Sequence, residues 1–143
     1  MGIIHSKAIE KTVPRPQSAG AVHFAKFTHI FSAAYTASGN VLEMGVLPPF
    51  AKIAGYKLIP EGSYGGVTAS MGILTGDLGA DGSRTQGTEL FAASTALTAA
   101  VDGVKPTAFD LESSDQERGI GVTLSGDVAA GSNKLTLLLF YYQ

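Results

Sequence analysis

The sequence predicts an all-β protein: an antiparallel β-sandwich or jelly roll of about seven to eight strands, with one short helix and an extended N-terminal arm. Short runs of branched and aromatic residues alternate in polarity, and turn signals separate them about every 8–12 residues. Eighteen glycines and a charged fraction of 15% favour many turns over long helices. With 143 residues, 45% of them hydrophobic, the chain can form one domain with its own core.

The first two apolar runs are expected to be strands. Residues 21–38 are rich in aromatic and branched side chains, but their alternation is imperfect, which indicates a bulge or burial on both faces. Residues 41–47 alternate more regularly and place Leu42, Met44 and Val46 on one face. The two prolines that follow end this strand, because neither can donate a ladder hydrogen bond.

Two further strands are expected before a long polar loop. Residues 51–60 place three apolar side chains on one face, namely Ala54, Tyr56 and Leu58. Residues 67–76 show the cleanest alternation in the chain, and its inward side chains are Val67, Ala69, Met71 and Ile73. The residues between these are small, so either another surface packs closely against that face or the face is solvated.

A polar loop and a helix are expected in the middle of the chain. Residues 77–87 resemble a calcium-binding loop superficially, but Gly79 occupies the third ligand position and Glu89 comes one place after the twelfth. We therefore interpret this segment as a polar surface loop. Residues 88–101 are expected to form the short helix, and residues 104–112 make a poor strand.

The last two strands are expected over residues 119–128 and 134–143. The final run is apolar on both faces. One face carries Leu135, Leu137, Leu139 and Tyr141, and the other carries Leu138, Phe140 and Tyr142. One face can fill the core of the monomer, and the other then needs a partner, unless both faces are covered within one sandwich.

The chain is expected to divide into an arm, residues 1–20, and a single sandwich domain, residues 21–143. Pro14 and Pro16 force an extended path, since each fixes its own φ and biases its predecessor away from helix. The arm is either flexible or laid on a neighbour. It is mildly basic, because Lys7, Lys11 and Arg15 outnumber the one acidic residue before position 21.

Composition excludes several classes of protein. The absence of cysteine excludes disulfides and thiolate metal sites. No apolar run approaches the roughly 18 residues needed to cross a bilayer, and the N-terminal residues lack the apolar core of a signal peptide. The net charge of −2 argues against general nucleic-acid binding. We therefore expect neither a membrane nor a nucleic acid as partner.

Catalytic patterns are absent as well. Residues 62–66 lack the lysine of a phosphate-binding loop, and no serine lies in a G-x-S-x-G turn. His23 and His29 share a face of one strand but lie about 20 Å apart, too far for one metal ion. The sequence therefore predicts a protein that is not an enzyme and that holds no metal or cofactor.

Four segments, in this order, carry a resemblance: "FSAAYTASGNVLEMGVLPPFAKIAGYKLIPEG", "GVTASMGILTGD", "TELFAAST" and "GIGVTLSGDVAAGSNKLTLLLFYYQ". Together they resemble small virion proteins of tailed bacteriophages, the head decoration or cement class, over about residues 27–143. The double proline in "LPPF" and the long final aromatic run depart from the pattern of that class. The segments carry no catalytic residue.

The resemblance implies a β-sandwich bound to the outside of an icosahedral head and made in the host cytoplasm before assembly. Its implied partners are the major capsid protein and copies of itself, with a trimer implied by analogy. Other readings are a collar, spike or fibre-base subunit, or a lectin-like binding module. The lectin reading would use Tyr64 beside Glu61, or Asp77 with Asp81.

Interface residues are expected among exposed aromatic side chains and in the basic arm. The aromatic candidates are Tyr35, Phe50, Tyr56, Phe140 and Tyr142. The arm candidates are Lys7, Lys11 and Arg15, which would meet an acidic capsid surface. These residues would cover apolar surface against a neighbour in the particle.

Overall fold

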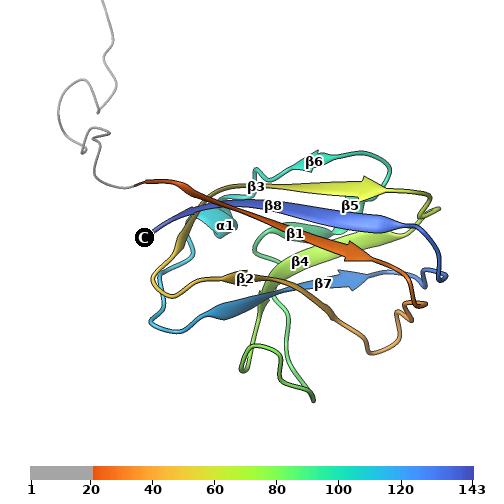
Figure 1. The fold of residues 1–143 in the computed structure, drawn as a ribbon, viewed down its shortest axis with the longest axis horizontal. Helices are drawn as coiled ribbons and strands as arrows, with labels where there is room; N and C mark the ends of the chain where they lie inside the picture. Colours follow the sequence, from red (N-terminus) through yellow and green to blue (C-terminus); the bar gives the residue numbers. More distant parts are fainter. Residues whose placement is uncertain (1–20) are drawn as a thin grey trace, which may run out of the picture.

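The computed structural model describes residues 21–143. The arm predicted for residues 1–20, with Lys7, Lys11 and Arg15, lies outside the described residues. Two four-stranded antiparallel sheets pack face to face, as Figure 1 shows. The predicted antiparallel sandwich is therefore confirmed. No helix in residues 21–143 is both long enough and apolar enough to cross a membrane.

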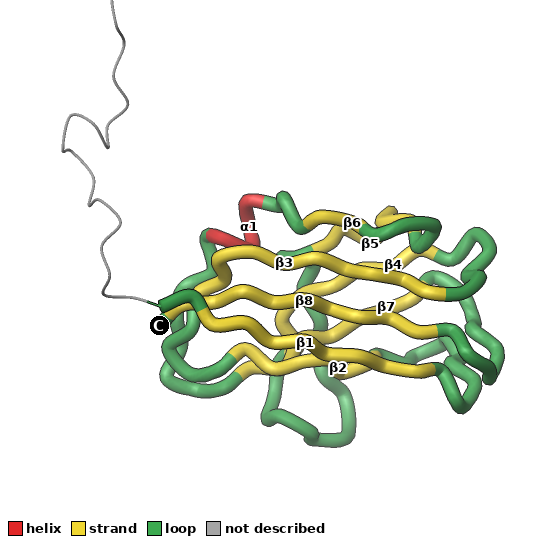
Figure 2. Tube along the Cα trace, turned by 45° about the horizontal axis from the view of Figure 1, so that its top comes forward, coloured by secondary structure: helices red, strands yellow, loops and turns green. Residues whose placement is uncertain are grey.

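The first sheet has the strand order β1-β8-β3-β6, and the second sheet has the order β2-β7-β4-β5. The strands run over β1 (His23–Ile30), β2 (Leu42–Leu47), β3 (Lys52–Glu61), β4 (Thr68–Leu74), β5 (Phe91–Ala96), β6 (Val101–Asp102), β7 (Arg118–Leu124) and β8 (Lys134–Tyr142). One short helix, α1, spans Pro106–Phe109. In Figure 2, β1 lies over β2 at one edge of the sandwich, and β6 and β5 lie at the other.

The core lies between the two sheets and is built from alternate residues of their central strands. The first sheet contributes Leu58, Leu135, Leu137 and Leu139. The second sheet contributes Ala69, Met71, Ile120, Val122 and Leu124. The inward faces predicted for residues 67–76 and 134–143 are thus confirmed where they carry Ala69, Met71 and the three leucines of β8.

Two β-bulges change the faces predicted for β2 and β3. The β2–β7 pairing shifts register between Glu43 and Gly45, so the side chain at position 47, and not Val46, points inward. The β3–β8 pairing shifts between Ile53 and Gly55, and Ala54 is exposed. The predicted faces are wrong on one side of each bulge, because one extra residue reverses the alternation beyond it.

The helix predicted over residues 88–101 is wrong. This segment forms β5 and β6 instead, because the threonine- and alanine-rich run from Phe91 pairs with β4. Pairing within the sandwich overrides the weak helical period, as tertiary context commonly does. The short helix lies in the segment predicted to be a poor strand and begins at Pro106, where proline suits the first helical position.

Candidate interface on the outer face of the first sheet

The outer face of the first sheet is the surface that this sheet turns away from the core. Its outward side chains on β1 are Phe24, Lys26, Thr28 and Ile30, which pair across the ladder with the outward residues of β8. Those on β8 include Leu138, Phe140 and Tyr142, and β3 adds Lys57 and Ile59. The alternation of each strand fixes this set, since the opposite parity fills the core.

Apolar side chains lie exposed on this face. Phe24 is 55% exposed and Ile30 is 53% exposed on β1, while Phe140 is 40% exposed and Tyr142 is 41% exposed on β8. The rings of Phe24 and Phe140 lie directly opposite each other, with centroids 5.1 Å apart. Phe24 and Phe140 form one exposed apolar group, whereas Ile30 lies at the other end of β1. An exposed apolar group of this kind is typical of a surface that meets another macromolecule.

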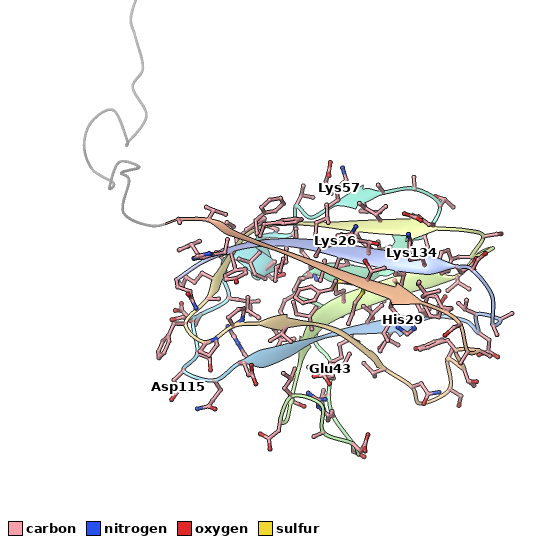
Figure 3. The ribbon with its side chains drawn as sticks, in the orientation of Figure 1. Lys26, His29, Glu43, Lys57, Asp115 and Lys134 are labelled. Atoms are coloured by element: carbon pink, nitrogen blue, oxygen red, sulfur yellow. The ribbon has the colours of Figure 1, made fainter. Side chains whose placement is uncertain are left out.

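Three lysines, Lys26, Lys57 and Lys134, also lie on strands of the first sheet (Figure 3). Lys57 lies 3.3 Å from Asp102, and Lys134 lies 3.0 Å from Glu61, in exposed ion pairs that stabilise the fold little. Lys26 contacts no carboxylate within residues 21–143. The outer face of the first sheet is therefore apolar with one lysine, Lys26, that an acidic group of a partner could meet.

The outer face of the second sheet, by contrast, is covered by the chain itself. Residues 84–89 fold back over it above three buried glycines, Gly72, Gly119 and Gly121. A Cβ on Gly72 would lie 2.2 Å from the carbonyl oxygen of Gly87, so only glycine fits there. The small outward residues between positions 67 and 76 are therefore packed against another segment of the chain and do not form a solvated face.

Polar contacts hold this covering segment in place. The Gln86 side-chain amide donates to Ser70 Oγ at 3.2 Å, and its oxygen accepts from Thr123 Oγ1 at 2.8 Å. The Arg84 guanidinium donates two hydrogen bonds to Glu43, at 2.8 and 2.9 Å. These bonds hold the pKa of the Glu43 carboxyl below its usual range, although partial burial opposes that shift.

The aromatic residues predicted as interface candidates divide into four groups. Phe140 and Tyr142 lie exposed on the outer face of the first sheet. Phe50 is 61% exposed in the β2–β3 turn, where its backbone amide donates to Ser114. Tyr35 is half-buried, and its hydroxyl donates to the carbonyl oxygen of Asn40 at 2.7 Å.

Tyr56 was predicted as an interface candidate and is a core residue instead. It is 4% exposed, and its hydroxyl donates to the carbonyl oxygen of Leu90 at 2.7 Å. Tyr56 has the parity of Leu58, on the face of β3 that fills the core, and its ring meets that of Phe91. Tyr64 is also buried, so it cannot present its ring to a sugar beside Glu61, as the lectin reading requires.

The sequence analysis missed Phe24, Lys26 and Ile30 as exposed residues of this face. Their strand was read as bulged or buried on both faces, whereas β1 is a regular strand with one face exposed. The signal was present in the shared parity of Phe24 and Ile30, but only the strand order shows that β1 lies at an edge.

Among residues 21–143, no three His, Asp or Glu side chains cluster closely enough to hold a metal ion. The imidazole of His23 stacks on Tyr141, and the ring of His29 meets Phe31 edge-on. Both histidines thus make aromatic contacts.

The structure is similar to known phage capsid structures. A chain in the capsid of Ralstonia phage GP4 matches with a TM-score of 0.74 and 32% sequence identity, over 91% of this chain and 89% of that one. A chain in the capsid asymmetric unit of cyanophage Pam1 shares the fold, with a TM-score of 0.61 and 15% identity over 91% and 90% of the two chains. No family model and no curated protein matches the sequence.

Proposed function

This chain belongs to the family of the matching Ralstonia phage GP4 capsid chain and is a structural protein of a bacteriophage virion, and we propose that it binds the outer surface of the capsid shell and stabilises it. The observation that carries this proposal is the contrast between the two sheets. The second sheet is covered by its own chain, and the outer face of the first sheet presents Phe24, Phe140 and Tyr142 to solvent.

The stabilisation would come from apolar area buried at many equivalent sites. Covering a half-exposed aromatic or aliphatic side chain recovers part of the about 1.5–3 kcal/mol gained by its full burial. A shell offers the same site many times, so a small gain at each site adds up over the particle. Neither bond-making nor a cofactor is needed for this role.

The proposed partners are the major capsid protein and copies of this chain. On the outer face of the first sheet, Phe140 and Tyr142 would contact apolar groups while Lys26 meets an acidic group. Phe50 would add a second, smaller contact at the end of the sandwich. Lys7, Lys11 and Arg15 would meet an acidic capsid surface, and the resemblance implies a trimer as the oligomer.

Co-sedimentation with heads that lack this chain tests the proposal. We expect the wild-type protein to pellet with the heads, and Phe140→Ser to weaken binding at least several-fold, because a polar side chain replaces an apolar contact. Val104→Ser is the matched control, since Val104 is an apolar residue, 78% exposed, that lies outside the first sheet's strands. Equal binding by wild type and both variants would exclude this face as the capsid contact.

A collar, spike or fibre-base position is the other outcome of the same experiment. Binding to tails or to the portal end, with none to the shell, would move the protein there and would leave its role in the virion intact. We propose the shell because the fold and the resemblance of residues 27–143 both fit a decoration protein.

A further inference from the structure

A sandwich of two open sheets has four edge strands, here β1 and β6 in the first sheet and β2 and β5 in the second. Three of these edges are interrupted. β6 has two residues, β2 carries a bulge and is followed by two prolines, and the pairing of β5 with β4 shifts register. Interruptions of this kind keep an edge from pairing with other strands.

The edge formed by β1 has no such protection among the described residues. β1 pairs with β8 over eight consecutive residues without a register shift, and it contains no proline. A long, regular edge strand presents a row of free backbone groups that another strand can pair with.

The direction of each backbone group on β1 follows from its neighbour Phe31. The Phe31 amide donates to Asn133, and its carbonyl accepts from Gly131, so both groups point toward the segment that leads into β8. Backbone direction alternates along a strand. The odd-numbered residues of β1 therefore bond β8, and the free edge consists of Phe24, Lys26, Thr28 and Ile30. The Ile30 carbonyl already accepts one bond, from Ser32.

We propose that this edge pairs antiparallel with the β1 edge of a second copy of the chain, about a two-fold axis at Phe27. In this register, Lys26 lies opposite Thr28 of the second copy, and Phe24 lies opposite its Ile30. All four free-edge residues of each strand then take part in backbone pairing with the other strand.

The two neighbouring registers, with the axis at residue 26 or 28, are each less favourable. A shift of the two-fold axis to residue 26 would place the two Lys26 ammonium groups directly opposite each other, which is destabilising. A shift to residue 28 would leave Phe24 without a partner. The axis at Phe27 also brings together Phe24 and Ile30, the two most exposed apolar side chains of β1.

Pairing would join the two first sheets into one continuous eight-stranded sheet whose outer faces point the same way. The exposed apolar side chains of both copies would then form one surface. The proposal goes beyond capsid binding and rests on the proposed function only for the presence of many copies. An isologous contact closes a dimer, so a trimer would need a second, different surface.

Two charge variants at one exposed position test the pairing in the full-length chain. In the proposed register Thr28→Lys faces Lys26 twice per dimer, and Thr28→Glu faces it twice with opposite charge. We expect Thr28→Lys to weaken the dimer about 2- to 30-fold and Thr28→Glu to strengthen it by a similar factor. Sedimentation equilibrium measures both, and since each variant loses the same contact with Thr136, that contact cannot explain opposite effects.

Cross-linking tests the register itself, because the chain has no cysteine of its own. Opposed residues of a hydrogen-bonded pair have Cα atoms about 5.5 Å apart, which a disulfide can span. Mixed and oxidised, Lys26→Cys and Thr28→Cys should give a heterodimer by mass, and Thr28→Cys alone should give no homodimer. Homodimers of Thr28→Cys, which keeps Lys26, or the absence of the heterodimer would indicate the wrong register and overturn the proposal.

Other results would also overturn it. A wild-type protein that stays monomeric at all accessible concentrations and gives no cross-link excludes the pairing. If deletion of residues 1–20 is needed before a dimer forms, the arm of the same chain covers the edge instead. Head binding is measured separately, so a monomer that still binds heads refutes this inference and leaves the proposed function standing.

Discussion

Phe24 of β1 and Phe140 of β8 lie directly opposite one another on the outer face of the first sheet, with ring centroids 5.1 Å apart. Leu137 lies on the opposite face of the same strand, β8, and is fully buried. The two faces of β8 therefore serve different purposes: Leu135, Leu137 and Leu139 hold the sandwich together, and Phe140 and Tyr142 on the other face are exposed to a partner.

Truncations on the two faces of β8 should have different effects on the free energy of unfolding. Leu137→Ala leaves a cavity in the core and should cost about 2–5 kcal/mol. Phe140→Ala loses an aromatic pair worth about 0.5–1.5 kcal/mol and a ring that is only partly buried, so it should cost less than Leu137→Ala. Urea denaturation measures both, and a double-mutant cycle with Phe24→Ala isolates the pair. Equal costs at the two positions would contradict the assignment of the faces.

Removal of the Glu43 carboxylate should make the free energy of unfolding less dependent on pH in the acid range. Arg84 lowers the pKa of Glu43 in the folded protein below its usual 4.5. Folded Glu43 therefore binds a proton less readily than the unfolded chain does, so its contribution is full above the usual pKa and is lost as pH falls through the lowered one. Glu43→Gln should unfold at a lower Tm at pH 7, and the difference from wild type should shrink as pH falls below about 4.

Exposed Glu117 supplies the control for this experiment, because it makes no ion pair within the described residues. Glu117→Gln should leave the Tm unchanged at pH 7. A Glu43→Gln protein whose deficit is constant from pH 7 to pH 3 would show that the Arg84 ion pair contributes nothing.

A methyl group under the covering segment of the second sheet should destabilise the protein. In Gly72→Ala the new Cβ would meet the Gly87 backbone, which cannot rotate away, and overpacking of this kind costs about 1–3 kcal/mol. Gly66→Ala, where nothing lies within 4 Å of the new Cβ, is the matched control and should be near neutral. Thermal unfolding by circular dichroism would reveal the difference, and equal Tm values would contradict the close packing.

Phe50 has a backbone φ of 61°, which is strained for a residue with a side chain. Glycine adopts this conformation freely but loses more entropy on folding, so Phe50→Gly should be more stable than wild type by about 0–1 kcal/mol. The same variant should bind heads less well if the exposed ring is a contact. A clear loss of stability, seen in urea denaturation, would show instead that the ring stabilises the turn.

Much of the fold could be predicted from the sequence because local alternation determines which face of a strand is apolar. Leu135, Leu137 and Leu139 could be assigned to the core from parity alone, and the opposite parity gave Phe140 and Tyr142 as exposed candidates. Parity predicts the wrong face where the pairing with a neighbouring strand, and not the strand's own sequence, sets the direction of a side chain. The bulge beside Ala54 reverses the alternation there, so Ala54 is exposed although parity places it on the buried face of Leu58.

The remaining errors come from contacts between segments distant in the sequence. Whether residues 91–96 form a helix or a strand depends on β4, to which they pair, and their own period does not reveal that pairing. The exposure of Phe24 and Ile30 depends on the position of β1 at the sheet edge. The small residues of the strand at 67–76 left open whether another surface packs there, and only the structure shows residues 84–89 lying over Gly72, Gly119 and Gly121.

An image reconstruction of phage heads with and without this chain would be the most direct test of capsid binding through the first sheet. The proposal predicts extra density on the outside of the shell that fits the sandwich, with the face carrying Phe24, Phe140 and Tyr142 turned toward neighbouring protein. Heads that show no difference, or density in which that face is turned to solvent while the second sheet makes the contact, would contradict it.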